Sequence, residues 1–584
     1  MSEYPRSDVR DGMRIDWDVP IQMDDKAVLR ADVYRPIQSG KYPVIITYGP
    51  YGKWLHFEDL YTDQWRRMVE EHPDVPSGST NKYQNWEVVD PEKWVPDGYA
   101  VVRVDSRGAG RSPGLLDIWS ARETKDFRDC IEWAARQPWS SGKVGLNGIS
   151  YYAMNQWQVA ALQPPHLAAI CIWEGAADYY RDLSHHGGIL CTFGRAWFPS
   201  QVIRVQHGKG SRGWRSRMNG DWVAGPAELT EEELGALRRD FYPDCENNPL
   251  ATDAYWTSRM PDWSKVKVPL FSAGNWGGTA LHPRGNIEGF VRAASRQKWL
   301  EMHGIEHWTH FYTDYGVSLQ KKFFGHFLKG QKTGWDKQPR VVLQVRHPGE
   351  KFVERNESEW PLKRAKWTKF YLSPAGADLS TKGGAAGKVS YDGLGEGVTF
   401  MTPPLKAGIE ITGPSAAKLF VSSSTRDADL FLILRVFDPN MKEITFQGAL
   451  DPHTPIAQGW LRASHRKLDE KLSLPYRPYH THDEVQPLKP GRVYELDIEV
   501  WPTCIAVPAG HRIALTVRGK DYEYPGGPGR GLGTLGAVFT GVGPFKHDDP
   551  NDRPPEVFGG KVTLHAGKKQ PSYIMLPVIP PKRG

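Results

Sequence analysis

The stretch Lys143-Val-Gly-Leu-Asn-Gly-Ile-Ser150-Tyr-Tyr-Ala153 decides the fold of this chain. A short apolar strand is predicted to run into Gly148-Ile149-Ser150, and a helix is predicted to begin immediately afterwards. A serine on a tight, strained turn between a strand and a helix projects its hydroxyl from the top of the sheet, which is the geometry of a nucleophile elbow. Ser150 is therefore the candidate nucleophile.

The turn departs at one position from the usual G-x-S-x-G pattern, because Tyr152 stands where the second glycine is expected. On spacing alone, Ser150 could instead be the N-cap of the following helix. The strand before it and the helix after it favour the nucleophile. The backbone N–H of Tyr151 then faces the same point and can donate to a developing oxyanion.

Strands and helices alternate on both sides of this stretch. Short β-branched runs bounded by Pro or Gly predict buried strands, and apolar residues at helical spacing predict helices. Such alternation predicts a parallel α/β sheet. The predicted strands are 44–48, 100–104, 144–146, 168–172, 268–272 and 299–302, and the predicted helices are 122–136, one from about 151, and 287–294.

Two regions break this alternation. Residues 183–262 are rich in Trp, Arg and Gly, with one acidic helix at 229–239 and no strand signal. An insertion after a central strand lies over the carboxyl ends of the strands, so a helical lid is predicted, with a peripheral decoration as the alternative. From about residue 340, short strands between Gly and Pro turns predict an all-β sandwich or jelly roll. The predicted organisation is an α/β domain in two parts (1–182 and 263–335), the lid insertion (183–262) and the β domain (340–584).

Composition excludes several classes of protein. The 39% hydrophobic residues of this 584-residue chain exclude a disordered protein. Lys plus Arg number 74 and Asp plus Glu 68, so the net charge is +6, and no window concentrates it into a nucleic-acid-binding face. No apolar run approaches the ~18 residues that cross a bilayer, and the charged start lacks the apolar core of a signal peptide. The five cysteines are scattered and indicate no disulfide framework, so we expect a cytoplasmic protein without nucleic-acid or membrane partners.

Three motifs, in this order, resemble a known group of hydrolases. Pro50-Tyr51-Gly52-Lys53, Asp105-Ser-Arg107-Gly108-Ala-Gly110-Arg-Ser112 and Gly148-Ile149-Ser150-Tyr151 are similar to those of the cocaine esterase and X-prolyl dipeptidyl peptidase group. The insertion and the C-terminal β domain match the group as well, so the resemblance covers nearly the whole chain. It implies an α/β-hydrolase fold followed by a jelly-roll-like domain. It also implies that the Tyr51 hydroxyl is the second oxyanion donor, the alternative being a packed loop aromatic.

A histidine must take the proton of the serine, because a serine hydroxyl at its normal pKa is a poor nucleophile. Three candidates follow the last predicted strand of the sheet, in Met302-His303-Gly-Ile-Glu-His307-Trp-Thr-His310. His307 is the first choice, because its loop has the commonest length for reaching back over the sheet. His303, which closes the strand, is the second. His310 is the third, in a Trp-Thr-His that looks like the Trp-Ser-His of the family.

The acid of the triad departs from the family pattern. The resemblance implies an aspartate in a Trp-Tyr-Asp-Gly type turn, but this chain has Asn275-Trp276-Gly277-Gly278 there, without a carboxylate. A triad keeps its geometry if the acid moves to the end of a neighbouring strand, so Glu174 is the predicted acid. Asp178 is the second choice, and Asn275 could orient the ring as an uncharged partner. Glu174 could instead pair with an arginine of the insertion.

No cofactor and no metal are predicted. Gly531-Leu-Gly533-Thr-Leu-Gly536 matches the GxGxxG dinucleotide pattern, but it lies in the all-β region without a strand–helix context. The three histidines at 303–310 could form a metal cluster, but no HExxH helix surrounds them.

The sequence therefore predicts a serine hydrolase that cleaves a carboxylic ester or amide of a small molecule through an acyl-enzyme. Amino-ester hydrolases of the resembling group hold a substrate amine with a carboxylate shortly after the nucleophile, where this chain has Ala153-Met154-Asn155. An ester with a neutral or aromatic acyl group is therefore favoured over a peptide. The alternatives are an X-prolyl or other acyl peptidase or amidase, an acyltransferase, and a non-catalytic binding protein on a hydrolase scaffold. The sequence does not identify the natural substrate, and it does not determine whether the protein forms a homo-oligomer.

Overall fold

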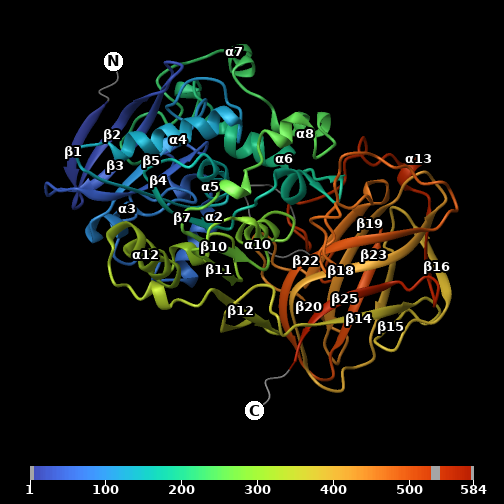
Figure 1. Ribbon diagram of the computed structural model, residues 1–584. Helices are drawn as coiled ribbons and strands as arrows, with labels where there is room; N and C mark the ends of the chain where they lie inside the picture. Colours follow the sequence, from blue (N-terminus) through green and yellow to red (C-terminus); the bar gives the residue numbers. More distant parts are fainter. Residues whose placement is uncertain (1–4, 528–538, 581–584) are drawn as a thin grey trace.

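The computed structural model describes residues 5–527 and 539–580 of the chain (Figure 1). The GxGxxG segment at 531–536 lies outside the described residues. The first part of the chain is built on one twisted sheet. Its strands are β1 (Arg6–Arg10), β2 (Met13–Gln22), β3 (Val28–Pro36), β4 (Tyr42–Gly49), β5 (Ala100–Asp105), β6 (Ser140–Ile149), β7 (Leu167–Trp173), β10 (Leu270–Asn275), β11 (Lys298–His303), β12 (Val341–His347) and β13 (Lys351–Glu357).

The strands of this sheet lie in the order β1-β2-β3-β5-β4-β6-β7-β10-β11-β12-β13. Pairing is parallel from β5 through β12, and antiparallel strands complete both edges. The predicted parallel α/β sheet is confirmed. β12, which was expected to open the β domain, pairs in parallel with β11 and also bridges to β22 at Arg346 and Ile505, so it joins the two parts of the chain.

Helices cover both faces of the sheet, because successive strand residues point to opposite sides. Val44 and Ile46 of β4 pack into one apolar cluster with helices α4 (Ala121–Ala135), α5 (Tyr151–Ala161) and α10 (Pro283–Arg292). Ile45, between them, belongs to the cluster on the other face, with helix α12 (Asp314–Lys329). The remaining helices of this part are short: α1 (Phe57–Leu60), α2 (Thr62–Glu71), α3 (Pro91–Trp94) and α11 (Thr309–Tyr312).

The segment between β7 and β10 departs from its prediction. A single acidic helix and no strand were expected, whereas the structure has several short helices and a two-stranded hairpin. Short helices of this kind are stabilised by tertiary contacts of their aromatic side chains and leave little periodic signal in the sequence. The segment contains β8 (His185–His186), β9 (Ile189–Leu190), α6 (Phe193–Trp197), α7 (Glu231–Ala236), α8 (Phe241–Asn247), α9 (Ala254–Thr257) and the turns η2 (Tyr180–Ser184), η3 (Phe198–Val202), η4 (Ile203–Val205), η5 (Gly210–Arg212) and η6 (Trp263–Lys265).

The C-terminal part is β-rich, as predicted. One set of strands pairs in the order β14-β25-β18-β22, and another in the order β21-β19-β23-β17. Their inward side chains form a separate apolar core. The strands are β14 (Lys366–Ser373), β15 (Asp378–Ser380), β16 (Gly387–Asp392), β17 (Val398–Met401), β18 (Ile409–Ser423), β19 (Asp429–Phe437), β20 (Glu443–Ile444), β21 (Ala457–Arg462), β22 (Tyr494–Val507), β23 (Arg512–Arg518), β24 (Lys561–Ala566) and β25 (Tyr573–Ile579). Its described residues also include the short helix α13 (Pro555–Phe558) and the turn η8 (Ala463–His465).

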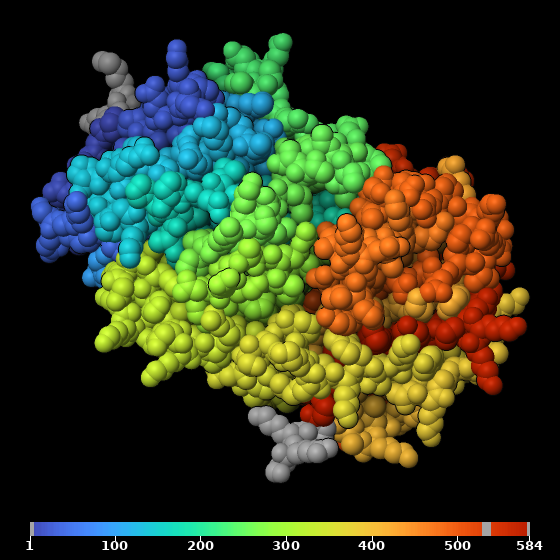
Figure 2. Space-filling view, viewed as in Figure 1, coloured from blue at the N-terminus to red at the C-terminus, as the bar shows by residue number. Residues whose placement is uncertain are grey.

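The two parts lie against each other, with the segment between β7 and β10 reaching the contact. Figure 2 shows residues of this segment, in green, beside the orange surface of the C-terminal part. A partly buried ion pair crosses the contact, since Arg284 Nε of α10 lies 2.9 Å from Glu499 Oε2 of β22. No helix in the described part of the chain combines the length and the apolar character that crossing a bilayer requires.

Candidate active site

Ser150 occupies a strained turn between β6 and α5. Its φ of 54° and ψ of −113° lie in a region that L-residues rarely adopt. The backbone N–H of Ser150 points at the carbonyl oxygens of Trp173 and Glu174, at 3.1 and 3.2 Å, where β7 ends. The neighbouring strand thus holds the turn at the carboxyl edge of the sheet.

The missing second glycine of the elbow is offset by glycines around Tyr152. A Cβ on Gly49 of β4 would lie 2.6 Å from Cε1 of the Tyr152 ring. A Cβ on Gly148 would lie 2.4 Å from the Cβ of Tyr152. The tyrosine therefore fits because the strands facing it carry no side chain at these two positions.

A cavity of about 40 Å³ opens beside Ser150. Its walls come from the α/β part, from the segment after β7 and from the C-terminal part, and the lining side chains are mostly aromatic or apolar. The lining residues are Tyr51, Tyr61, Gln64, Trp86, Glu87, Ser150, Phe193, Trp197, Gln201, Leu281, His307, Trp308 and Leu450.

His307 lines this cavity and contacts Glu174, so the structure brings the first-choice histidine and the first-choice acid together. Nδ1 of His307 lies 2.7 Å from Oε2 of Glu174. The backbone N–H of His307 donates to the carbonyl oxygen of Ala449 in the C-terminal part, at 3.0 Å. The ring stacks on His282 with centroids 5.1 Å apart.

The charges of this pair shift both pKa values. Burial would lower the pKa of His307, but the charge of Glu174 and its hydrogen bonds outweigh burial and raise the pKa to about 10. Burial would raise the pKa of Glu174, but His307 and His303 hold it at about 2. The pair therefore favours an imidazolium beside a carboxylate.

His303 lies behind Glu174, away from the cavity. Nε2 of His303 is 3.2 Å from Oε1 of Glu174, and its Nδ1 is 2.7 Å from Oε2 of Glu301. The Tyr315 hydroxyl donates to the other oxygen of Glu301, at 3.0 Å. His303 therefore contacts Glu174, the predicted acid, and does not line the cavity beside Ser150.

The other predicted candidates take different positions. Asn275 donates to Oε1 of Glu174 at 3.2 Å and to the carbonyl of Ile305 at 2.7 Å, so it contacts the acid and not the imidazole. Asp178 pairs with Arg181 at 2.7 Å. His310 lies partly buried beside the ring of His303, and desolvation lowers its pKa to about 3. In the described part of the chain, no arginine pairs with Glu174.

Glu87 is a site residue that the sequence did not reveal. Its Oε1 lies 2.8 Å from Nε2 of His307, and its Oε2 is buried without a hydrogen-bond partner among the described residues. The carbonyl of Glu87 accepts the N–H of Ile149 at 3.0 Å, which anchors it to the Ser150 turn. Burial raises the pKa of Glu87 to about 7. Glu87 lies between α2 and α3, in a segment without periodicity or a motif, so no signal in the sequence could have found it.

In this structure, Nε2 of His307 therefore contacts Glu87 and not the hydroxyl of Ser150. The imidazole is held between two carboxylates, and all three side chains are almost fully buried. An imidazole held in this way lines the same cavity as Ser150 but directs its Nε2 at Glu87.

The two predicted oxyanion donors, Tyr51 and Tyr151, lie side by side, with ring centroids 5.8 Å apart. The Tyr51 hydroxyl accepts a hydrogen bond from Nε1 of Trp197 at 3.2 Å, which leaves its own proton free to donate elsewhere. Burial raises the pKa of Tyr51 far above its usual value, so the hydroxyl stays protonated. The Tyr151 hydroxyl donates to Glu123 at 2.6 Å and faces away, whereas its backbone N–H begins α5, where no intrahelical acceptor exists.

Comparison with known protein families matches nearly the whole chain. Residues 25–312 match the model of the X-Pro dipeptidyl-peptidase (S15 family), and residues 333–575 match that of the X-Pro dipeptidyl-peptidase C-terminal non-catalytic domain. Over 96% of its length, the chain is 23% identical to the cocaine esterase of Rhodococcus sp., covering 98% of that protein. It is 24% identical over 74% of its length to a putative serine esterase of Mycobacterium tuberculosis, covering 80% of it.

Solved structures of hydrolases are also similar to this chain over nearly its whole length. A CocE/NonD family hydrolase from Staphylococcus aureus is 30% identical with a TM-score of 0.82, over 97% of this chain and 94% of that chain. An α-amino acid ester hydrolase is 16% identical with a TM-score of 0.67, over 98% of both chains, which shows a common fold.

Proposed function

The chain belongs to the hydrolase family of the S15 X-Pro dipeptidyl-peptidases and the CocE/NonD hydrolases, and on that premise we propose that it is a serine esterase working through an acyl-enzyme. Ser150 attacks the ester carbonyl, His307 takes the proton and returns it to the leaving alcohol, and Glu174 orients and stabilises the imidazolium. The observation that carries this proposal is the 2.7 Å contact between Nδ1 of His307 and Glu174 beside a strained serine turn.

The proposed acid lies on the strand next to the family position. The family aspartate corresponds to the turn after β10, where this chain has Asn275, whereas Glu174 follows β7. The two strands pair in parallel, so their carboxyl ends are adjacent, and the longer side chain of glutamate reaches the same histidine. Asn275 then donates to Glu174 and helps to fix its position.

The proton transfer requires one local rearrangement. Nε2 of His307 must leave Glu87 and meet the Ser150 hydroxyl, and the imidazole must be neutral when it does so. After the alcohol has left, water enters and His307 removes a proton from it, so that the water attacks the acyl-enzyme and releases the acid.

The tetrahedral intermediate is proposed to be held by the Tyr51 hydroxyl and the Tyr151 N–H. The segment 183–262 would act as a lid. It supplies Phe193, Trp197 and Gln201 to the cavity, and Trp197 holds the hydroxyl of Tyr51. The aromatic walls favour a neutral acyl group.

A second candidate, hydrolysis of an amino ester or of an amino-terminal peptide, is favoured by Glu87. The argument against a substrate amine was that no carboxylate follows Ser150, yet the fold brings the carboxylate of Glu87 into the cavity from another segment. Comparing an activated amino ester with its N-acylated analogue separates the candidates. Faster turnover of the N-acylated ester supports the esterase, and faster turnover of the free amine supports the second candidate.

The first experiment is labelling with a fluorophosphonate probe, located by peptide mass spectrometry. We expect one adduct per chain on Ser150, none in Ser150→Ala, and labelling slowed by orders of magnitude in His307→Ala, since the base activates the serine. His303→Ala is the matched control and should label much faster than His307→Ala. No adduct, together with no hydrolysis of activated esters, would favour a non-catalytic binding protein. Products formed with an added alcohol or amine instead of water would identify an acyltransferase.

A further inference from the structure

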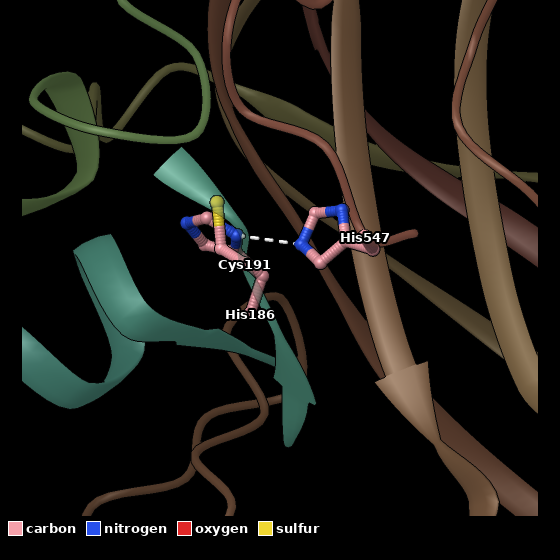
Figure 3. Close-up of side chains that lie close together, drawn as sticks. All are labelled: His186, Cys191 and His547. Atoms are coloured by element: carbon pink, nitrogen blue, oxygen red, sulfur yellow. Dashed lines mark hydrogen bonds between the residues drawn. The ribbon is translucent and has the colours of Figure 1, made fainter. Parts of the chain in front are cut away.

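A second group of chemically reactive side chains lies outside the lining of the cavity beside Ser150, where the segment after β7 meets the C-terminal part. His186 is in β8, Cys191 follows β9, and His547 lies in a loop of the C-terminal part (Figure 3). One ligand atom from each of the three lies within 4.8 Å of the other two, and all three residues are buried. Nδ1 of His186 faces Nε2 of His547 at 2.8 Å, and the cysteine sulfur lies beside them.

The outer nitrogen of each imidazole is already fixed as a donor. Nδ1 of His547 lies 2.8 Å from a carboxylate oxygen of Asp521, and Nε2 of His186 lies 3.0 Å from the carbonyl oxygen of Asp182. The other carboxylate oxygen of Asp521 accepts the backbone N–H of His547 at 2.6 Å, so the carboxylate faces His547 as an acceptor. A carbonyl oxygen also only accepts.

It follows that the two inner ring nitrogens, Nδ1 of His186 and Nε2 of His547, face each other without a proton on either. A neutral imidazole carries one proton, and both of these rings place it on the outer nitrogen. The inner lone pairs repel each other unless a positive centre lies between them, which must be a proton or a cation. The sulfur of Cys191 at the same point favours a cation, because a proton needs only the two nitrogens.

We propose that His186, Cys191 and His547 form a structural site for a borderline-soft transition-metal ion, with Zn²⁺ as the ion that fits best. Two imidazole nitrogens and one thiolate select such an ion over Mg²⁺ or Ca²⁺, which take oxygen ligands. Metal-bound histidines commonly donate their other N–H to a carboxylate or a backbone carbonyl, as both histidines do here. Binding releases the thiol proton of Cys191.

The geometry can hold the ion if the three ligand atoms, which lie within 4.8 Å of one another, shift toward tetrahedral spacing. Zn–N distances of about 2.0–2.1 Å in a tetrahedral site place the two nitrogens about 3.3 Å apart, roughly half an ångström wider than in this structure. Aromatic rings enclose the site, with Trp460 and Trp501 centred 4.9 and 5.6 Å from the ring of His186. This apolar shell limits solvent at the site to the water that would complete a tetrahedral set of ligands.

The site would tie the lid segment to the C-terminal part of the molecule. Two ligands come from the segment and one from the loop at 547, which already contacts the segment where Thr192 N–H donates to the carbonyl of Lys546 at 2.7 Å. Helix α6, which carries Trp197, begins two residues after Cys191. A metal here would therefore stabilise the segment that holds Tyr51.

The test measures zinc bound to the intact chain. Protein stripped with a chelator is titrated with Zn²⁺, bound metal is quantified by mass spectrometry, and the melting temperature is followed. We expect one zinc per chain and a higher melting temperature in the wild type. Cys191→Ser and His547→Gln should lose the stoichiometric ion. Cys130→Ser, which changes a buried cysteine in α4, is the matched control and should keep it.

Two further measurements keep the test independent of misfolding. Asp521→Asn keeps all three ligands and should weaken zinc binding 10–100-fold. Co²⁺ in place of zinc should show a sulfur-to-cobalt charge-transfer band that Cys191→Ser abolishes. The proposal is overturned if the wild type binds no zinc, or if Cys191→Ser binds zinc as well as the wild type does. The two histidines would then share a proton instead of a metal ion. Labelling of Ser150 does not depend on this result, so the two proposals fail separately.

Discussion

Glu87 is the residue that most alters the chemistry expected of His307. A general base must be neutral at the operating pH, yet the two carboxylates raise the pKa of His307 to about 10. The neutral fraction of His307 therefore grows as the pH rises toward that value. The free enzyme should accordingly show an esterase activity that increases through the alkaline range.

Glu87→Gln should shift the acid limb of the pH profile of kcat/KM to lower pH. Removing one of two carboxylates lowers the pKa of His307, and an opposite charge at this distance changes a pKa by about 1–3 units. The profile is measured with a neutral activated ester. Glu70→Gln, on the exposed face of α2, is the control and should leave the profile unchanged. An unmoved acid limb in Glu87→Gln would show that Glu87 does not act on the base.

Tyr51→Phe should lower kcat about 10²–10³-fold with little change in KM, because the hydroxyl is proposed to bind the oxyanion only in the transition state. Steady-state kinetics on an activated ester measures this. Tyr61→Phe is the matched control, since Tyr61 also lines the cavity but its hydroxyl has no hydrogen-bond partner among the described residues. Equal losses in the two variants would remove Tyr51 from the mechanism.

At the scale of elements, the elbow depends on how β4 packs against α5. Tyr152 points from the first turn of α5 toward β4, and the absence of a side chain at Gly49 makes room for its ring. The sequence pattern showed only that the second glycine after Ser150 is absent. The glycine that makes room for Tyr152, Gly49, lies on β4, about a hundred residues before the elbow.

Gly49→Ala should destabilise the protein by about 1–3 kcal/mol, because its Cβ would lie 2.6 Å from the ring of Tyr152. Thermal or denaturant unfolding measures the loss. Gly235→Ala in α7 is the control, since a Cβ there meets no atom within 4 Å, and alanine favours a helix over glycine by up to about 1 kcal/mol. An unchanged stability of Gly49→Ala would show that Tyr152 can move without cost.

At the scale of the whole molecule, the C-terminal part helps to build the site. It supplies Leu450 to the cavity wall and the Ala449 carbonyl that fixes the backbone of His307. The contact is backbone against backbone, since a Cβ on Gly277 would lie 2.3 Å from the Cα of Gly448. The position of His307 thus depends on how the two parts dock.

Gly277→Ala should push the loop around Ala449 away and lower kcat/KM about 10²-fold, the usual cost of displacing a catalytic group by about 1 Å. Kinetics and the melting temperature are measured together. Gly213→Ala, whose new Cβ would lie no closer than 3.4 Å to another atom, is the control and should behave as the wild type. Full activity in Gly277→Ala would mean that docking does not position His307.

The sequence by itself determined the α/β sheet and the turn at Ser150. Both are local: alternating apolar strands and helices follow from side-chain periodicity, and the elbow occupies a few consecutive residues. It also placed Glu174 at the carboxyl end of β7, and His303 and His307 at the carboxyl end of β11. These two strands lie on either side of β10, and the carboxyl ends of parallel strands share one edge of the sheet.

Only the tertiary structure decided which of these side chains meet and what else joins them. The choice among three histidines within eight residues depends on loop geometry, and the contact of Glu87 with His307 joins segments separated by 220 residues. The pairing of His186 with His547 spans 361 residues. Such contacts leave no periodic or spacing signal, because they are set by how the sheet, the insertion and the β domain pack, and this packing sums many weak interactions along the whole chain.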